Sequence, residues 1–223
     1  MQDNYLVLHA IGCTIITLKK INGEGTQMAR YSYNQTEEQS CTAAAIMVTL
    51  AELGKIASTD IDQTREMRIW EQTKRGTVQG KEEVMPHNGI DCLCSYGLHT
   101  ELHENNQITA VLKHAAAADY AEYERGLQHY QITRSGAVNI TTAFANDARV
   151  FLIVGFMSGQ DLKTHTVLMR RDQGSLWVMN PDGGTDTQYT DAEVLQFTSG
   201  QTAPVPFAGR DYLCAGIAYR AWV

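Results

Sequence analysis

The first half of the chain carries apolar residues at helical spacing. The run Cys41-Thr-Ala-Ala-Ala-Ile-Met-Val-Thr-Leu50 is rich in alanine, and Gly54 is a residue type favoured just past helix ends. We therefore expect a buried helix from about 41 to 53. A second helix is expected over about 59–74, and one or two more over about 106–129.

Runs of β-branched and apolar residues predict strands at the start of the chain and throughout its second half. The segment 5–21 is expected to form one or two strands, and 76–88 a loop around Pro86. After Gly136, apolar runs alternate with Ser-Gly, Asp-Gln-Gly and Asp-Gly-Gly turns, which is typical of antiparallel strands with short connections. The strands expected there cover 149–156, 164–169, 175–179 and 212–222.

The order of these elements predicts the fold class. Helices come first and antiparallel strands follow, which is typical of an α+β protein. At 223 residues the chain fits a single domain, 1–223, with a substantial core. We expect a helical part at about 41–135 packed on an antiparallel sheet at about 147–223, with the strands of 5–21 added. An active-site cleft would lie between the helical part and the sheet.

Composition and charge narrow the classes of partner. The formal net charge is −7 and the chain contains no run of Lys or Arg, so a nucleic-acid partner is not expected. The apolar stretches are shorter than the roughly 18 residues that a membrane span needs. The N-terminus lacks a basic segment, so we expect a protein made in the cytoplasm without a Sec signal. Export by a specialised secretion system remains open.

Four polar residues stand at positions that suit thiol chemistry. Cys41 opens the Ala-rich helix, and Gln35 precedes it by six residues. His165 lies at the head of one expected strand, and Asn180 closes the next, directly before the turn 181–184. A thiol at a helix N-terminus, a distant His and a third polar group that orients the His are the parts of a thiol nucleophile. Gln35 would donate to the oxyanion together with the Cys41 backbone N–H.

Each of these residues also has a structural interpretation. A Cys in an Ala-rich helix is often a small core residue, and Asn before Pro-Asp-Gly-Gly is a common turn residue. Gln39 is a second candidate for the oxyanion donor. Glu37 and Glu38 stand close to Cys41 in sequence, and carboxylates near a thiol raise its pKa. A binding module without catalysis is therefore an alternative interpretation.

The four positions together resemble the papain-like cysteine peptidase superfamily. His165 follows Cys41 by 124 residues and Asn180 follows His165 by 15, in the order Gln, Cys, His, Asn. The chain lacks the Cys-Gly-Ser-Cys-Trp run of papain and the cathepsins around Cys41. The short chain and the ending His…Asn-Pro-Asp-Gly-Gly are closer to bacterial members, such as secreted effector proteases of the YopT and AvrPphB type, some of them virulence factors, and leader-peptidase-like domains.

The resemblance implies a role for each residue and an activity. Cys41 would be the nucleophile, His165 the general base and acid, Asn180 the residue that orients His165, and Gln35 the oxyanion donor. In some relatives an Asp takes the third position, which makes Asp182 a rival to Asn180. The implied activity is cleavage of a peptide or amide bond through an S-acyl enzyme. A glutamine deamidase or a transglutaminase-type acyl transferase would use the same triad.

The resemblance also implies the partners. The substrate would be a protein or peptide, and a secretion chaperone or an immunity protein is an expected binding partner of an exported enzyme. The chemistry needs no cofactor and no metal. Cys92 and Cys94, with three histidines nearby, are a weak zinc candidate, because their one-residue spacing differs from the two-residue spacing of common zinc sites.

Overall fold

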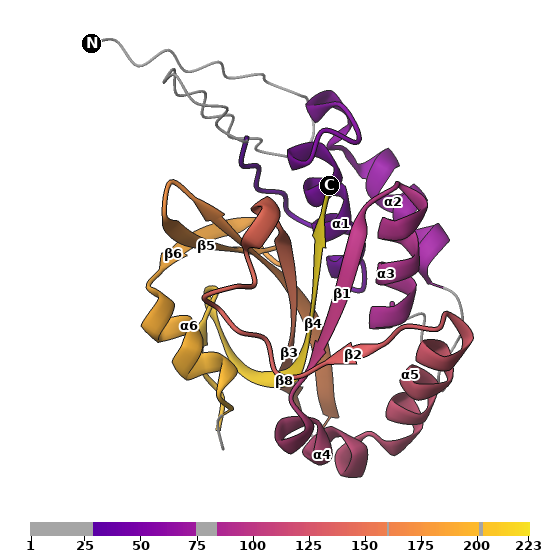
Figure 1. Cartoon of the computed structure of the whole chain (residues 1–223), viewed down its shortest axis with the longest axis vertical. Helices are drawn as coiled ribbons and strands as arrows, with labels where there is room; N and C mark the ends of the chain where they lie inside the picture. Colours follow the sequence, from indigo (N-terminus) through magenta and orange to yellow (C-terminus); the bar gives the residue numbers. More distant parts are fainter. Residues whose placement is uncertain (1–28, 75–83, 160, 201–202) are drawn as a thin grey trace.

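A computed structural model describes residues 29–74, 84–159, 161–200 and 203–223 (Figure 1). The strands expected over 5–21 and most of the loop expected over 76–88 lie outside these residues. The described chain is a mixed α+β structure with six helices and an eight-stranded sheet. The helices are α1 (Cys41–Glu52), α2 (Gln63–Thr73), α3 (Pro86–Ser95), α4 (Asn106–Ala115), α5 (Ala117–His129) and α6 (Asp191–Thr198).

The sheet has the strand order β2-β1-β8-β3-β4-β5-β6, and β7 pairs with β8. Its strands are β1 (His99–Glu104), β2 (Arg134–Ser135), β3 (Arg149–Ser158), β4 (Asp161–Asp172), β5 (Ser175–Asn180), β6 (Thr185–Tyr189), β7 (Val205–Phe207) and β8 (Arg210–Trp222). All pairings are antiparallel except that of β1 with β2. The last strand of the chain, β8, therefore lies in the interior of the sheet between β1 and β3.

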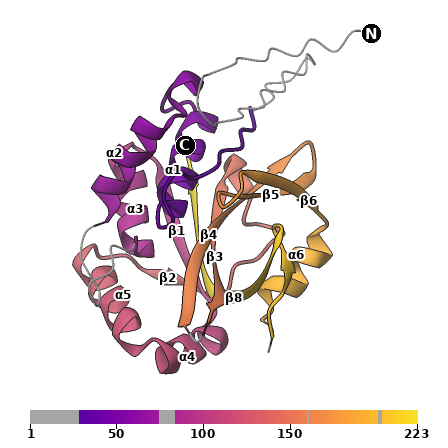
Figure 2. The same ribbon diagram turned by 180° about the vertical axis from the view of Figure 1, so that it is seen from behind.

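Helices cover both faces of the sheet (Figures 1 and 2). One apolar core joins α1, α2, α3 and α5 to one face, and the second lies against the other face beneath α6. Every residue of α1 is buried, so its apolar residues encircle the helix instead of forming a stripe. The Ala-rich sequence allows this close packing on all sides. Among the described helices, none combines the length and apolar composition that crossing a bilayer requires.

Several elements differ from the expectation. Strands β1 and β2 lie within the part expected to be helical, and helix α6 lies within the part expected to be sheet. The β1 sequence, His-Thr-Glu-Leu-His-Glu, is too polar for a strand to be predicted from its pattern. In the structure it nevertheless pairs with β8 along its whole length. Pro86, expected in a loop, instead begins α3, where its missing N–H costs no hydrogen bond.

A group of buried charges links α1 to the sheet. Glu52, at the end of α1, accepts hydrogen bonds from the Arg149 side chain and from the backbone N–H of Tyr31. Arg170 lies with its Nε 3.3 Å from a Glu52 oxygen and its Nη2 3.0 Å from an Asp186 oxygen. Arg170 is 1% exposed and Glu52 is fully buried, so these charges neutralise one another inside the protein.

Candidate active site

Strand β4 extends past the end of β5, and the N-terminus of α1 lies beside the part of β4 that β5 does not pair. β4 pairs with β3 along residues 161–169, but with β5 only from Leu168 onward. Beside this part of β4, the Thr42 hydroxyl of α1 contacts the Thr166 hydroxyl at 2.7 Å. Cys41 is the first residue of α1 and is 8% exposed. The backbone of Thr166 on β4 acts to lower the pKa of this thiol.

His165 and Asn180 form a directed pair beside this thiol. His165 Nε2 lies 2.7 Å from Asn180 Oδ1, and both residues are buried. The Asn180 Nδ2 donates to the carbonyl of Ala208 at 2.9 Å, and its Oδ1 also accepts from the backbone N–H of Asp182 at 3.0 Å. Because Oδ1 is thereby an acceptor, Nε2 of His165 carries the proton and donates it. Nδ1 remains for Cys41, to which His165 is hydrogen-bonded.

The surroundings change the pKa values of this pair in opposite directions. Burial acts to raise the pKa of the Cys41 thiol, but the charge of His165 and the hydrogen bonds from His165 and Thr166 outweigh it and lower that pKa. Burial acts to lower the pKa of His165, but the charge of Cys41 and the hydrogen bonds to Cys41 and Asn180 raise it. A thiolate and an imidazolium therefore stabilise each other.

Strand β8 supplies the other side of the His165 ring. Tyr212 stacks on that ring with centroids 5.7 Å apart and planes 7° from parallel. The same tyrosine lies with its hydroxyl 3.3 Å from Asn180 Nδ2. Tyr212 is fully buried, so one face of the ring packs on a fixed aromatic side chain. The sequence offered no signal for this tyrosine beyond its place in an expected strand.

Gln35 lines the same cavity, but its amide is engaged locally. Its Nε2 donates to the carbonyls of Glu37 at 2.8 Å and Glu38 at 3.0 Å, while its Oε1 is buried and has no hydrogen-bond partner among the described residues. Its backbone N–H donates to the carbonyl of Pro181 at 2.9 Å. Gln35 thus organises the approach to α1 in this conformation. Gln39, the second candidate, is exposed and also lines the cavity.

Asp182 stands close to the site without touching the ring of His165. Its carboxylate forms an ion pair with Arg210 at 3.0 Å, and its side chain is 52% exposed. Its negative charge contributes to the raised pKa of His165, whereas the direct hydrogen bond to the ring comes from Asn180. In this geometry the His165 ring is hydrogen-bonded to Asn180, whereas Asp182 acts on it only through its charge.

Glu66 on α2 is a residue of the site that the sequence did not indicate. It is fully buried and accepts from the Tyr33 hydroxyl at 2.9 Å, the Thr36 hydroxyl at 2.7 Å and the Ser40 hydroxyl at 2.5 Å. The backbone N–H of Thr36 also donates to it at 3.0 Å. Glu66 therefore ties the segment with Gln35 to the residue before Cys41. Only its place on an expected helix was visible beforehand.

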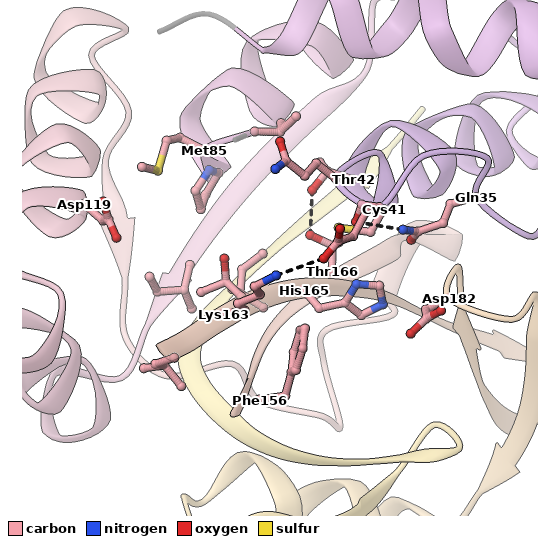
Figure 3. Close-up of a pocket in the computed structure, with 18 of the residues that line it drawn as sticks. Gln35, Cys41, Thr42, Met85, Asp119, Phe156, Lys163, His165, Thr166 and Asp182 are labelled. Atoms are coloured by element: carbon pink, nitrogen blue, oxygen red, sulfur yellow. Dashed lines mark hydrogen bonds and ion pairs between the residues drawn. The ribbon is translucent and has the colours of Figure 1, made fainter. Parts of the chain in front are cut away.

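The cavity beside Cys41 has a volume of about 620 Å³ (Figure 3). At one end lie Gln35, Cys41, His165 and Asp182, and at the other end lie Met85 and Asp119. The wall between the two ends is built from β3, β4, α4 and α5. A Lys163–Glu38 ion pair of 2.9 Å also belongs to the lining. The site is therefore the end of a long depression, with room beyond the thiol for more than one side chain.

The weak zinc candidate gains no support from the geometry. Cys92 is buried on α3, whereas Cys94 of the same helix is exposed and contacts the Thr100 hydroxyl at 3.3 Å. Within the described ranges, no group of three or more His, Cys, Asp or Glu side chains is arranged to hold a metal ion.

Comparison of the chain with known protein families finds no match, and comparison with curated proteins finds none.

Proposed function

We propose that this protein is a thiol-dependent hydrolase that cleaves a peptide or amide bond through an S-acyl intermediate. The observation that carries the proposal is the arrangement of Cys41, His165 and Asn180. The thiol pKa is lowered, the His165 ring is hydrogen-bonded to the thiol, and Asn180 holds the opposite ring nitrogen at 2.7 Å. A papain-like relationship fits the order of these residues and remains part of the proposal.

The chemistry follows from the proton positions. The Cys41 thiolate adds to the carbonyl carbon of the substrate, which places negative charge on the carbonyl oxygen. The His165 imidazolium then protonates the leaving amine, and the amine departs as the carbonyl re-forms as a thioester. A water molecule, deprotonated by the now neutral His165, attacks that thioester. The acid product leaves, and the proton returns the pair to its starting state.

The oxyanion needs hydrogen-bond donors on the Cys41 side. The backbone N–H groups at the start of α1 have no partner inside the helix, and the helix dipole favours negative charge there. Gln35 becomes a second donor when its Nε2 gives up the hydrogen bond to the Glu37 or Glu38 carbonyl and donates to the oxyanion instead. This exchange makes Gln35 a donor that substrate binding recruits.

The long cavity favours cleavage within a peptide over reaction of a single side chain. Its roughly 620 Å³ runs from Cys41 to α4 and α5, which is more space than one glutamine side chain fills. Deamidation and acyl transfer begin with the same thiolate attack and differ only in the leaving group and the second nucleophile. Mass spectrometry of incubated candidate proteins separates the three by cleaved chains, by the mass gain of deamidation, or by crosslinks.

Alkylation kinetics test the activated thiol directly. Iodoacetamide or the epoxide E-64 should modify Cys41 faster than any other cysteine, as mapped by peptide mass spectrometry. Cys94 is the reference because it is exposed, whereas Cys92 and Cys214 are buried. If Cys41 reacts no faster than Cys94, the thiol is not activated, and the catalytically silent binding module becomes the better interpretation.

A further inference from the structure

The far end of the cavity carries a carboxylate that the proposed chemistry does not use. Asp119 lies in the first turn of α5 and lines the cavity. Figure 3 shows its side chain pointing into the pocket from the wall opposite Cys41 and Gln35. Among the described residues, no hydrogen bond or ion pair engages its carboxylate. A negative charge in the first turn of a helix interacts favourably with the helix dipole, but this interaction gives neither carboxylate oxygen a hydrogen-bond donor.

The charges that line the cavity are unbalanced. Four carboxylates, those of Glu37, Glu38, Asp119 and Asp182, line it together with two cations, Lys163 and Arg210. Lys163 pairs with Glu38 and Arg210 pairs with Asp182, each within 3.0 Å. Among the described residues that line the cavity, the carboxylates without an ion-pair partner are those of Asp119 at the far end and Glu37 near the thiol. A cavity with this balance attracts a cationic group.

The wall next to Asp119 suits the hydrocarbon stem of a basic side chain. Met85, Pro86, Leu112 and Ala116 supply apolar surface there. Tyr120 also lines the cavity. Its hydroxyl donates to the buried Glu104 at 2.7 Å, so the ring is the part of this side chain that can contact a ligand. The Nζ of Lys113 lies 4.7 Å from the centroid of the same ring.

From these three observations we propose that the cavity is a specificity subsite for a basic side chain of the substrate, with Asp119 as its charged partner. A Lys or Arg side chain enters past the apolar wall and forms a charge-assisted hydrogen bond with the Asp119 carboxylate. This inference rests on the proposed function, because it names the class of peptide that reaches Cys41. It makes Asp119 a specificity residue that never contacts the reacting atoms.

Matched peptide probes test the subsite. Peptidyl vinyl sulfones are prepared with Lys, norleucine or Glu at the first or second residue from the reactive group, and modification of Cys41 is followed by mass spectrometry. Norleucine keeps the stem of lysine and lacks its charge. We expect the lysine probe to react about 10-fold faster than the norleucine probe at one of the two positions, as one charge-assisted hydrogen bond provides. Each rate is normalised to the norleucine rate of the same variant.

Substitutions assign the preference to one carboxylate. Asp119→Asn should bring the lysine-to-norleucine ratio close to one, and Asp119→Lys should make the Glu probe the fastest of the three. Glu122→Gln is the matched control, because it removes the same charge from the same helix and does not line the cavity. That control should keep the wild-type ratio. A ratio near one in the wild type at both positions, or a ratio unchanged in Asp119→Asn, would overturn the subsite.

The subsite and the thiol chemistry are separable in one further measurement. Ethyl sulfone analogues of the same peptides bind without reacting, so calorimetry on the intact protein gives their Kd values independently of Cys41. A lysine preference of about 10-fold in Kd supports the subsite even if iodoacetamide shows no activation of Cys41. Equal Kd values for the lysine and norleucine analogues, with Cys41 activated, reject the subsite and leave the hydrolase proposal in place.

Discussion

At the scale of single residues, Asn180 determines which nitrogen of His165 faces the thiol. The amide of Asn180 is fixed by its donation to Ala208 and by the N–H of Asp182 that it accepts. With the Asn180 amide flipped, its NH₂ group would face the Asp182 N–H and the Nε2–H of His165, which are donors themselves. The amide therefore keeps its oxygen toward His165, and the ring has one favourable tautomer, with the proton on Nε2. The proton on Nε2 leaves Nδ1 available to Cys41.

Removal of Asn180 should therefore slow turnover without abolishing it. Asn180→Ala is expected to lower kcat by about 10- to 100-fold, because the ring loses its orientation but keeps the stacking partner Tyr212. It also leaves the Ala208 carbonyl without its donor, which should cost about 1–3 kcal/mol of stability. Peptide turnover and thermal unfolding, measured on the same samples, separate the two effects.

Asp182→Ala is the matched comparison for the third position. The Asp182 carboxylate is half exposed and pairs with Arg210, so its loss should change kcat by less than about threefold. The reverse ranking, with Asp182→Ala crippling and Asn180→Ala almost silent, would transfer the third position to Asp182. Asn180→Asp should recover part of the Asn180→Ala loss, because it restores an acceptor for His165 Nε2.

The reactivity of Cys41 should extend to lower pH than that of an ordinary thiol. The pKa of the Cys41 thiol is lowered from the ordinary value of 9.0. At a given pH below 9.0, a larger fraction of Cys41 than of an ordinary cysteine is therefore thiolate. In His165→Ala the compensating charge is gone while burial remains, so the midpoint of alkylation against pH should move upward. Cys214, whose pKa burial raises to about 11, should not be labelled in the same range. Iodoacetamide rates from pH 5 to 10, resolved by peptide, measure these midpoints; an unchanged midpoint in His165→Ala would contradict the pairing.

At the scale of elements, the segment before α1 depends on one carboxylate of α2. Glu66→Ala removes the acceptor of three hydroxyls and one backbone N–H. These donors are buried or partly buried, so they would lose a hydrogen bond that water cannot fully replace. We expect a loss of about 2–4 kcal/mol in the free energy of unfolding and slower alkylation of Cys41. Urea unfolding and iodoacetamide kinetics provide the two measurements.

Glu71→Ala is the control on the same helix. Glu71 is 59% exposed and pairs only with Lys74 of its own helix among the described residues. Its removal should change stability by less than about 1 kcal/mol and leave alkylation unchanged. Equal effects of the two substitutions would show that Glu66 contributes through helix α2 in general. Glu66→Gln, which keeps one acceptor oxygen, should lie between Glu66→Ala and the wild type.

Elements with strong apolar patterns were predicted from the sequence, and polar or short elements were not. Helix α1 was predictable because an Ala-rich run ends at a glycine, and β3 because it is apolar along most of its length. Strand β6, Thr-Asp-Thr-Gln-Tyr, has no apolar alternation because it is an edge strand. Helix α6 has eight residues and a Thr190–Glu193 capping box, which was the one local signal that it carried.

At the scale of the whole molecule, the buried charges around Glu52 join α1, β3, β4 and β6. Glu52→Gln removes the buried carboxylate that pairs with Arg149 and Arg170, so the two buried guanidinium groups are no longer fully neutralised. We expect a loss of about 3–5 kcal/mol in the free energy of unfolding, measured in urea. Asp191→Asn, which breaks an exposed pair with Arg171, is the control and should cost less than about 1 kcal/mol. A similar loss in both variants would contradict a special role for the buried charges.

The parts of the site differ in how far the sequence could reveal them. Cys41, His165 and Asn180 were selected by residue type and by their places at the ends of expected elements. The structure brings these three together. Glu66 and Asp119 carry no such mark, since a Glu or Asp on a helix is usually solvated. Their position depends on how α2 and α5 pack, and packing is set by contacts between residues far apart in the chain.

The central place of β8 has a consequence for the timing of synthesis. Residues 208–222 supply the interior strand that joins β1 to β3, the Tyr212 ring that stacks on His165, and the Ala208 carbonyl that accepts from Asn180. A nascent chain in which these residues are still inside the ribosome has two unconnected groups of strands, β1 with β2 and β3 to β6. Its cysteine has already emerged, but His165 still lacks the stacked Tyr212 ring, and Asn180 still lacks the Ala208 carbonyl to which it donates. We therefore expect His165 to reach its final orientation beside the thiol only after β8 has joined the sheet.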